Sequence, residues 1–301
     1  MRIGYPCINT TLGCKSGRTF RLKSYSEERL VATVENNLDC LARILDFNAH
    51  NHLLFFRITS DLIPFASHPV CRFNWQQHFS AQLSEIGRLA RRRAMRISMH
   101  PDQFVVMNSP NQEVVENSIR ELQYHAQILD LMGLDSSAKI QIHVGGVYGD
   151  RAQSLDRFAR RHALLSEAVR RRLVVENDER SYALVDCLKV SAKTGIPALF
   201  DAFHHQVHNH GEGMAEALRL AARTWKDADG LPMVDYSQPA PGKTEGSHAT
   251  CINIQQFRRF LSETSPLDFD VMLEIKDKEK SALKAVKAAR HDARFVTTTS
   301  V

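Results

Sequence analysis

Short runs of apolar residues recur eight times along the chain, separated by longer segments with a different periodicity. Most of the runs are rich in β-branched and aromatic residues and stay apolar at their centres, as strands buried on both faces do. We therefore predict strands at residues 2–6, 53–59, 96–100, 139–144, 173–178, 197–203, 232–237 and 269–276.

The segments between these runs repeat apolar residues every three or four positions, which predicts amphipathic helices. The first helix is expected to begin after a capping box formed by Ser24 and Glu27, or after the nearby Ser26. The predicted helices cover residues 28–48, 75–92, 113–132, 154–170, 182–194, 214–223, 254–263 and 278–289.

This alternation of strand and helix predicts a parallel α/β protein, either a closed barrel or a doubly wound open sheet. Polar residues follow nearly every predicted strand, which favours a closed ring with one mouth over a sheet whose site lies at one switch point. We predict a single parallel (β/α)8 TIM barrel with a metal site at its C-terminal mouth. The barrel domain covers residues 1–290, a polar tail covers 291–301, and residues 238–246 form a long loop over the mouth.

Composition narrows the class of protein only a little. The chain has 301 residues, which fits one barrel of roughly 250 residues with insertions. Its 43% hydrophobic and 24% charged content argues against disorder. The net charge of +5 and the arginine runs at 91–93 and 170–172 suit a polyanionic partner, although solvated helix ends explain each run equally well.

The six cysteines contain no CxxC pair, so we expect reduced thiols in an intracellular protein. The first residues do not resemble a signal peptide, and no apolar run approaches the roughly 18 residues of a membrane span. These features predict a protein without membrane contact, located in the cytoplasm and, in a bacterium, associated with the nucleoid.

Histidines and acids stand at or just beyond the ends of the predicted strands. Polar side chains there are expensive to bury unless they are paired or coordinate a cation. Imidazole and carboxylate are natural ligands of zinc, manganese or iron. A lone histidine at a strand end is more often structural, but nine residues on six or seven strands favour a metal centre. The candidate metal ligands are His68, His100, His143, Glu176, Asp201, His204, Asp235, His248 and Glu274.

Two members of this set stand out. Asp201 and His204 form an Asp-x-x-His segment that can present both side chains to the mouth, and Glu176 follows the middle strand, where a carboxylate could bridge two cations. Paired metal ions acidify a shared water and neutralise charge on a phosphodiester, which suits hydrolysis of a nucleic-acid backbone. The histidines on helix faces are assigned to solvent or core: His50, His78, His125 and His162.

The chain also resembles the UV damage endonuclease family, whose members are related to endonuclease IV and the xylose-isomerase-like barrels. Nearly the whole chain takes part. The segments that carry the resemblance are GYPCIN at 4–9, PFASHP at 64–69, SMHPDQF at 98–104, ENDER at 176–180, DAFHH at 201–205, SHA at 247–249 and LEIK at 273–276.

The resemblance implies an enzyme that nicks DNA immediately 5′ of UV photoproducts, both cyclobutane dimers and 6-4 products, and leaves a 3′ hydroxyl and a 5′ phosphate. Abasic sites are a further implied substrate. The implied cofactors are two or three divalent ions, manganese first, with zinc, cobalt or magnesium as alternatives. The implied catalytic residues are Glu176, Glu274 and Asp201.

By motif position, the metal ligands divide among three sites. His68, His100 and Glu176 would hold one ion, and His204 with His248 a third. The second would lie among Glu176, Asp201, Asp235 and Glu274, with His143 as an additional residue of unassigned site. Asp235 departs from the endonuclease IV pattern, which has histidine there, and this makes the second site more anionic.

The same resemblance assigns lesion binding to Tyr5, Asn9, Gln103 and Phe104. A damaged dinucleotide stacks poorly, so extruding it is easier than extruding an intact pair, and Phe104 can fill the vacated space. A core phenylalanine is the alternative. The implied partner is double-stranded DNA that contains UV lesions, and a monomer suffices to bind it.

Two other functions remain open at this point. A sugar isomerase on the same barrel would also place acids and histidines around two metal ions, but it has no use for a basic surface. A damage-binding protein without activity would have no use for a complete metal centre.

Overall fold

The computed structural model describes residues 1–243 and 246–297, and within them eight parallel strands close into one barrel in sequence order, as predicted. Each of the eight predicted apolar runs contains one strand. The strands are β1 (Ile3–Pro6), β2 (Phe55–Ile58), β3 (Arg96–Met99), β4 (Lys139–His143), β5 (Leu173–Glu176), β6 (Ala198–Asp201), β7 (Met233–Tyr236) and β8 (Asp270–Leu273).

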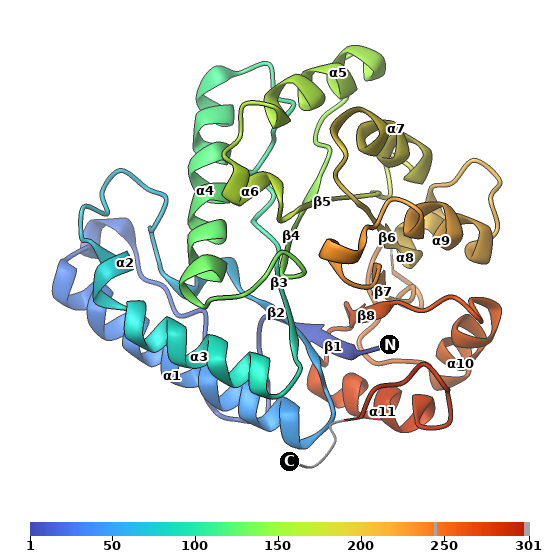
Figure 1. Cartoon of the computed structure of the whole chain (residues 1–301), viewed down its shortest axis with the longest axis horizontal. Coiled ribbons are helices and arrows are strands. Elements are labelled where there is room, and N and C mark those ends of the chain that lie inside the picture. The colour runs from blue at the N-terminus through green and yellow to red at the C-terminus, as the bar shows by residue number, and fades with distance from the viewer. Residues whose placement is uncertain (244–245, 298–301) are drawn as a thin grey trace.

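Helices surround the ring of strands, which places the barrel interior at the centre of the molecule (Figure 1). The α-helices are α1 (Glu27–His50), α2 (Trp75–His78), α3 (Ser80–Arg92), α4 (Gln112–Leu131), α5 (Arg151–His162), α6 (Glu167–Arg170), α7 (Leu184–Thr194), α8 (Ala202–Val207), α9 (Met214–Ala222), α10 (Ile254–Glu263) and α11 (Glu279–Ala289). Short 3-10 helices cover Leu22–Ser24, Ser60–Leu62 and Asp227–Asp229.

The helix boundaries follow local capping chemistry. The Ser26 side chain accepts a hydrogen bond from the Arg29 backbone N–H, and this fixes the start of α1 at the second of the two predicted caps. At its carboxyl end, α7 stops at Gly195, whose φ of 76° is the left-handed conformation that glycine adopts most easily.

Two predicted helices are each divided in the structure, and one helix was not predicted. The segment 75–92 breaks at Phe79, and the segment 154–170 breaks before Ser166, whose extended backbone starts α6. The apolar spacing continues through both breaks, so periodicity alone could not locate them. The short α8 follows Asp201 directly, and Asp201 is its N-cap.

Side chains on alternate strand positions point into the barrel, and they form two layers there. The lower layer is apolar and consists of Phe55, Val174, Leu199, Met233 and Met272. Two residues further along each of these strands comes a charged residue on the same inward face. These residues are Arg57, Glu176, Asp201, Asp235 and Glu274. The apolar layer therefore serves as the floor of a charged layer at the mouth.

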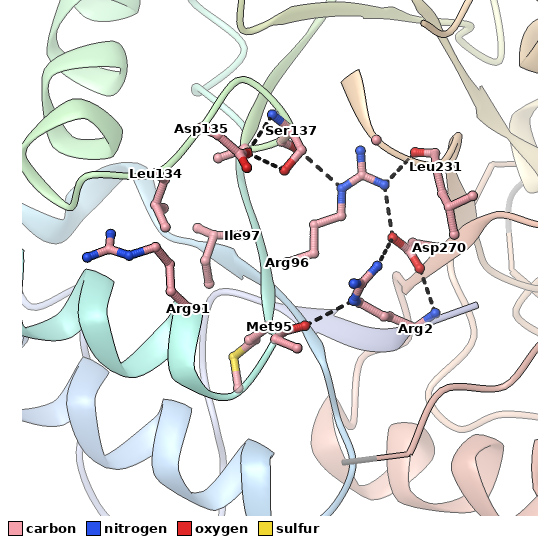
Figure 2. Close-up of a pocket in the computed structure, with 13 residues that line it drawn as sticks. Arg2, Arg91, Met95, Arg96, Ile97, Leu134, Asp135, Ser137, Leu231 and Asp270 are labelled. Atoms are coloured by element: carbon pink, nitrogen blue, oxygen red, sulfur yellow. Dashed lines mark hydrogen bonds and ion pairs between the residues drawn. The ribbon is translucent and has the colours of Figure 1, made fainter. Parts of the chain in front are cut away.

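The amino-terminal end of the barrel is closed by buried ion pairs. Asp270 accepts hydrogen bonds from the Arg2 backbone N–H at 2.6 Å and from the Arg96 guanidinium at 3.0 Å. Figure 2 shows Arg2 and Arg96 converging on Asp270 beside a cavity of about 290 Å³. Arg91 also lines this cavity and donates to the Met132 carbonyl. These arginines are occupied by carbonyls and by Asp270, so this end of the barrel is built for stability.

The predicted polar tail is packed over its described part. Val296 donates its backbone N–H to the Met1 carbonyl at 3.0 Å, and Arg294 donates to the carbonyls of Leu261 and Leu267. Residues 298–301 of the predicted tail, and residues 244 and 245 of the predicted loop over the mouth, lie outside the described residues. No helix of the described chain is long and apolar enough to cross a membrane.

The expectation that all six cysteines are reduced thiols was wrong for one pair. Cys14 and Cys40 form a disulfide with their Cα atoms 5.8 Å apart. Cys14 lies in the first loop and Cys40 on α1, and the loop folds back onto that helix. Since the two residues are 26 positions apart and belong to no spacing motif, only the packing of the loop reveals the pair.

We predict that Asp270→Asn lowers the free energy of unfolding by about 3–5 kcal/mol, because it leaves the buried Arg96 guanidinium without its counter-charge. Urea unfolding followed by circular dichroism measures the change. Asp156→Asn is the control, since Asp156 and its partner Lys193 are each 48% exposed. Equal stability of the two variants would contradict the role of Asp270.

Candidate metal centre

The carboxyl ends of the strands bring eight of the nine predicted ligands together. His143, Glu176 and Asp201 are the last residues of β4, β5 and β6, and Asp235 lies within β7. His100 and Glu274 come directly after β3 and β8. His204 lies on α8. His248 is on the loop after β7, where it forms an isolated antiparallel β-bridge with Pro239. Because all strands are parallel, these residues share one end of the barrel.

Glu176 lies at the centre of the site. Its Oε2 atom is 3.5 Å from His100 Nε2 and 3.9 Å from His143 Nε2. Its Oε1 atom faces the other way and is 3.8 Å from His204 Nδ1. The two oxygens of this carboxylate therefore serve two different groups of imidazoles, as a bridging ligand would.

The second group is built by the cap of α8. Asp201 Oδ1 accepts the His204 backbone N–H at 2.6 Å, and this turn carries the His204 ring to 3.5 Å from Asp201 Oδ2. Asn177 holds both partners, because its side chain bonds the Asp201 backbone and its carbonyl accepts from His204 Nδ1 at 3.0 Å. The Asp-x-x-His spacing thus has the geometric effect that the sequence predicted.

The third group is held by two residues that the sequence analysis missed, Arg57 and Gln141. Asp201, Asp235 and Glu274 have carboxylate oxygens within 4.8 Å of one another. The buried guanidinium of Arg57 donates to Asp235 and to Glu274, and the Gln141 amide donates to Asp235 at 2.7 Å. The sequence did carry a signal for both residues, because inward-facing side chains alternate along a strand. Arg57 comes two residues after the apolar Phe55, and Gln141 comes two residues before the predicted ligand His143.

The two remaining histidines differ in their surroundings. His248 lies beside the centre, since its Nδ1 is 3.9 Å from Glu274 Oε2 and its ring is 6.1 Å from that of His204. His68 is exposed, accepts a hydrogen bond from the Val70 backbone and belongs to none of the three groups of close donors. A ligand role for His68 stays a prediction.

Mutual interactions shift the pKa values of these groups strongly in the metal-free protein. Burial raises the pKa of Glu176, but the imidazoles of His143 and His100 lower it by more than that. The net pKa therefore falls far below its usual value. Burial raises the pKa of Asp201 to about 8. Burial lowers the pKa of His204, but the charges of Asp201 and Glu176 outweigh it and raise that pKa to about 9.

The donor set fits a divalent metal ion. Asp201 Oδ2 is buried and receives no hydrogen bond, which leaves a carboxylate oxygen available for a cation. The Nδ1 atoms of His100 and His248 lie 2.9 Å from backbone carbonyls. Donation of Nδ1–H to those carbonyls leaves Nε2 of each ring free to bind a metal. Imidazole nitrogens with carboxylate oxygens suit manganese, zinc or iron.

The four predicted lesion-binding residues divide into two kinds. Gln103 and Phe104 project from the loop after β3, and Phe104 is 50% exposed. Tyr5 and Asn9 are buried instead: Tyr5 donates its hydroxyl to Asn48 on α1, and Asn9 donates to the Tyr5 oxygen. In this structure the latter pair braces the first loop, and a lesion contact for Tyr5 and Asn9 stays a prediction.

Two clefts flank the loop that carries Gln103. One, of about 300 Å³, includes His100, His143 and Arg180. The other, of about 410 Å³, includes Glu274 together with Lys276 and Lys278. The second cleft therefore joins the candidate metal centre to two lysines at the rim of the barrel, where phosphates could be held. The first cleft also contains Asp102, Asp178 and Glu179.

The fold and the site define a parallel β/α barrel with a candidate metal centre at its carboxyl-terminal mouth. Comparison with known proteins identifies the family to which the chain belongs. The chain belongs to the UV-endonuclease UvdE family, whose model matches residues 1–300. It is 37% identical to a UV DNA damage endonuclease of Clostridium perfringens over 292 residues, which are 96% of this chain and 71% of the relative. The crystal structure of SacUVDE superposes with a TM-score of 0.92 at 48% identity and covers 96% of this chain and 98% of its own.

More distant structures share the fold alone. Endonuclease IV from Thermus thermophilus is 16% identical, with a TM-score of 0.56 over 83% of this chain and 93% of its own. D-Psicose 3-epimerase from Clostridium cellulolyticum is 12% identical, with a TM-score of 0.56 over 86% of this chain and 94% of its own. Because a nuclease and a sugar epimerase match equally well, the barrel by itself does not decide the activity.

We predict that the affinity of the metal-free protein for Mn²⁺ rises with pH between about 6 and 8. A ligand must lose its proton to bind a cation, and the raised pKa values of Asp201 and His204 keep protons on this pair at neutral pH. Each displaced proton changes the affinity about tenfold per pH unit. Calorimetric titration at several pH values measures the slope. Asp201→Asn should bind more weakly with a shallower slope, and a pH-independent affinity would contradict the assignment.

Proposed function

We propose that this protein is a metal-dependent DNA repair endonuclease that cleaves the phosphodiester backbone of UV-damaged DNA. The observation that supports it most is the convergence of histidines and carboxylates around Glu176 in a chain of the UV-endonuclease family. The basic rim beside this centre and the net charge of +5 suit a polyanionic substrate.

The side chains would divide the work as follows. Bound divalent ions, with manganese as our first choice, supply positive charge that polarises the phosphodiester and acidifies water. Glu176 orients the imidazoles on either side of it, and Asp201 offers its free Oδ2 oxygen to a metal ion. Glu274 offers a carboxylate on the opposite side of the centre. The proposed metal ligands are His100, His143, Glu176, Asp201, His204, His248 and Glu274.

The proposed substrate is double-stranded DNA that contains a cyclobutane dimer or a 6-4 product, with abasic sites accepted as well. Cleavage would fall immediately 5′ of the lesion and leave a 3′ hydroxyl and a 5′ phosphate. Lys276 and Lys278 are positioned to hold phosphates next to the metal centre. One lesion requires one active site, so the proposed working form is a monomer.

Lesion recognition is proposed for the loop after β3. Gln103 lines both clefts, and Phe104 follows it as an exposed aromatic. Exposure of an apolar ring to water is unfavourable, so an exposed aromatic next to an active centre indicates a binding role. Such a ring can fill the gap left by an extruded dinucleotide. The short distance along the chain from His100 would link insertion of Phe104 to placement of the scissile phosphate.

We predict that Glu176→Gln abolishes the nicking of irradiated plasmid by the Mn²⁺-loaded protein. The loss should exceed the roughly 10–100-fold effect of removing a group that only supports a metal ligand. A gel assay of supercoiled plasmid, with and without chelator, measures it, and Glu263→Gln on the surface of α10 is the control. Binding without nicking by the wild type would indicate a damage-binding protein, and turnover of free sugars would indicate the isomerase alternative.

We predict that Phe104→Ala weakens binding to a photoproduct-containing duplex by about 1–3 kcal/mol and leaves binding to undamaged duplex nearly unchanged, because base–aromatic stacking is lost only where bases are extruded. Fluorescence anisotropy with both duplexes measures the difference. Leu164→Ala is the matched control, since Leu164 is a 79% exposed apolar residue between α5 and α6 that lines neither cleft. Equal losses on both duplexes would remove the proposed role.

A further inference from the structure

Arg57 is a buried cation inside the candidate metal centre. It lies on β2, two residues after Phe55 of the apolar floor, and it is nearly inaccessible to solvent. Its guanidinium donates to Asp235 Oδ1 at 2.7 Å and Oδ2 at 2.6 Å, and it forms a further ion pair with Glu274. Both contacts come from one nitrogen, Nη2, so this is a charge-assisted contact shared between the two carboxylate oxygens.

Gln141 adds an acceptor for this cation, although the Nε atom of Arg57 has no hydrogen-bond partner among the described residues. The Gln141 carbonyl oxygen accepts from Arg57 at 2.6 Å, and the amide donates to Asp235 at 2.7 Å and to Glu176 at 2.8 Å. Asp235 therefore receives three hydrogen bonds, and its Oδ2 atom has two of them. Asp201 differs, because its Oδ2 receives none. Of these two buried aspartates, only Asp201 keeps an oxygen that is free for a metal.

The balance of charge also favours Asp201 over Asp235 as a metal ligand. Four carboxylates converge at the mouth: Glu176, Asp201, Asp235 and Glu274. Arg57 neutralises one of these charges, and two divalent ions would neutralise the other three with one positive charge left for a hydroxide or a substrate phosphate. A third divalent ion beside the guanidinium would leave three uncompensated positive charges in a site with little solvent, which is strongly unfavourable.

We propose that Arg57 occupies a cation position at the Asp235 end of the centre, so that Asp235 is a partner of arginine and is not a metal ligand. The centre then takes about two divalent ions, bound by the ligands proposed above, and Arg57 acts as a positioning residue that sets this number. The proposal rests on the metal centre of the proposed function, and it replaces the ligand role that the resemblance suggested for Asp235.

Metal counting tests this directly. Each protein is stripped with chelator, reloaded with Mn²⁺, freed of excess ion by gel filtration and analysed for manganese per chain. We expect about two ions in the wild type and one more in Arg57→Met, because the vacated position exposes three carboxylates to a cation. Arg57→Lys keeps the positive charge and should keep the wild-type count. An unchanged count in Arg57→Met overturns the proposal.

The single variant Asp235→Asn tests directly whether Asp235 is a metal ligand, and this test does not depend on the folding of Arg57→Met. Asp235→Asn should keep the wild-type manganese count, whereas Asp201→Asn should lose an ion. The double variant Arg57→Met, Asp235→Asn should return to the wild-type count, since the extra ion needs the Asp235 carboxylate. Loss of an ion in the single variant Asp235→Asn means that Asp235 is a ligand, and it overturns the proposal.

The same measurements separate this inference from the proposed function. A wild type that binds no manganese would overturn both the metal centre and the role of Arg57. A wild type that binds about two ions, gains one in Arg57→Met and yet does not nick irradiated plasmid would support the role of Arg57 and overturn only the nuclease activity.

Discussion

Four carboxylates that converge at the barrel mouth, three of them buried and Glu274 half-buried, are the constraint on which the rest of this molecule depends. Each ionised carboxylate costs several kcal/mol to remove from water, and mutual repulsion adds to that cost. Glu176, Asp201, Asp235 and Glu274 are tolerated at the mouth because positive charge and protons surround them. Arg57 supplies fixed charge, and the raised pKa values of His204 and Asp201 favour protons on this pair when no metal ion is bound.

The barrel makes this concentration of charge possible through a simple alternation. Inward side chains follow one another at every second strand position, so an apolar layer and a charged layer stack along the barrel axis. The apolar layer around Phe55 and Met233 closes the interior from below, and the ion pairs around Asp270 close the far end. The charges are therefore fixed on rigid elements at one end of the barrel.

Elements that hold charge and elements that would meet DNA are separated in this architecture. Strand ends fix the donors around Glu176, whereas loops carry Gln103, Phe104 and the basic rim. Loops that project from a rigid scaffold can adapt to a distorted duplex without disturbing the geometry at the strand ends. Tyr5 and Asn9 belong to the scaffold in this structure, since both are buried and bonded to each other.

The sequence by itself determined the barrel and most of the histidines and acids that meet at its mouth. Apolar runs located all eight strands and their order, because a strand buried on both faces must be apolar along its centre whatever its neighbours are. The helix 254–263 was predicted to the residue, and polar residues at or beyond strand ends identified the eight predicted ligands that converge. These features follow from local chemistry and from the parallel arrangement that the alternation required.

Only the tertiary structure decided which side chains meet. The register between strands brings Arg57 of β2 to Asp235 of β7, and no spacing along the chain marks this pair. The disulfide between Cys14 and Cys40 and the exposed position of His68 depend in the same way on how loops pack. Periodicity reports the neighbours of a residue along the chain, whereas the partner of a buried charge is set by contacts between residues that are far apart in sequence.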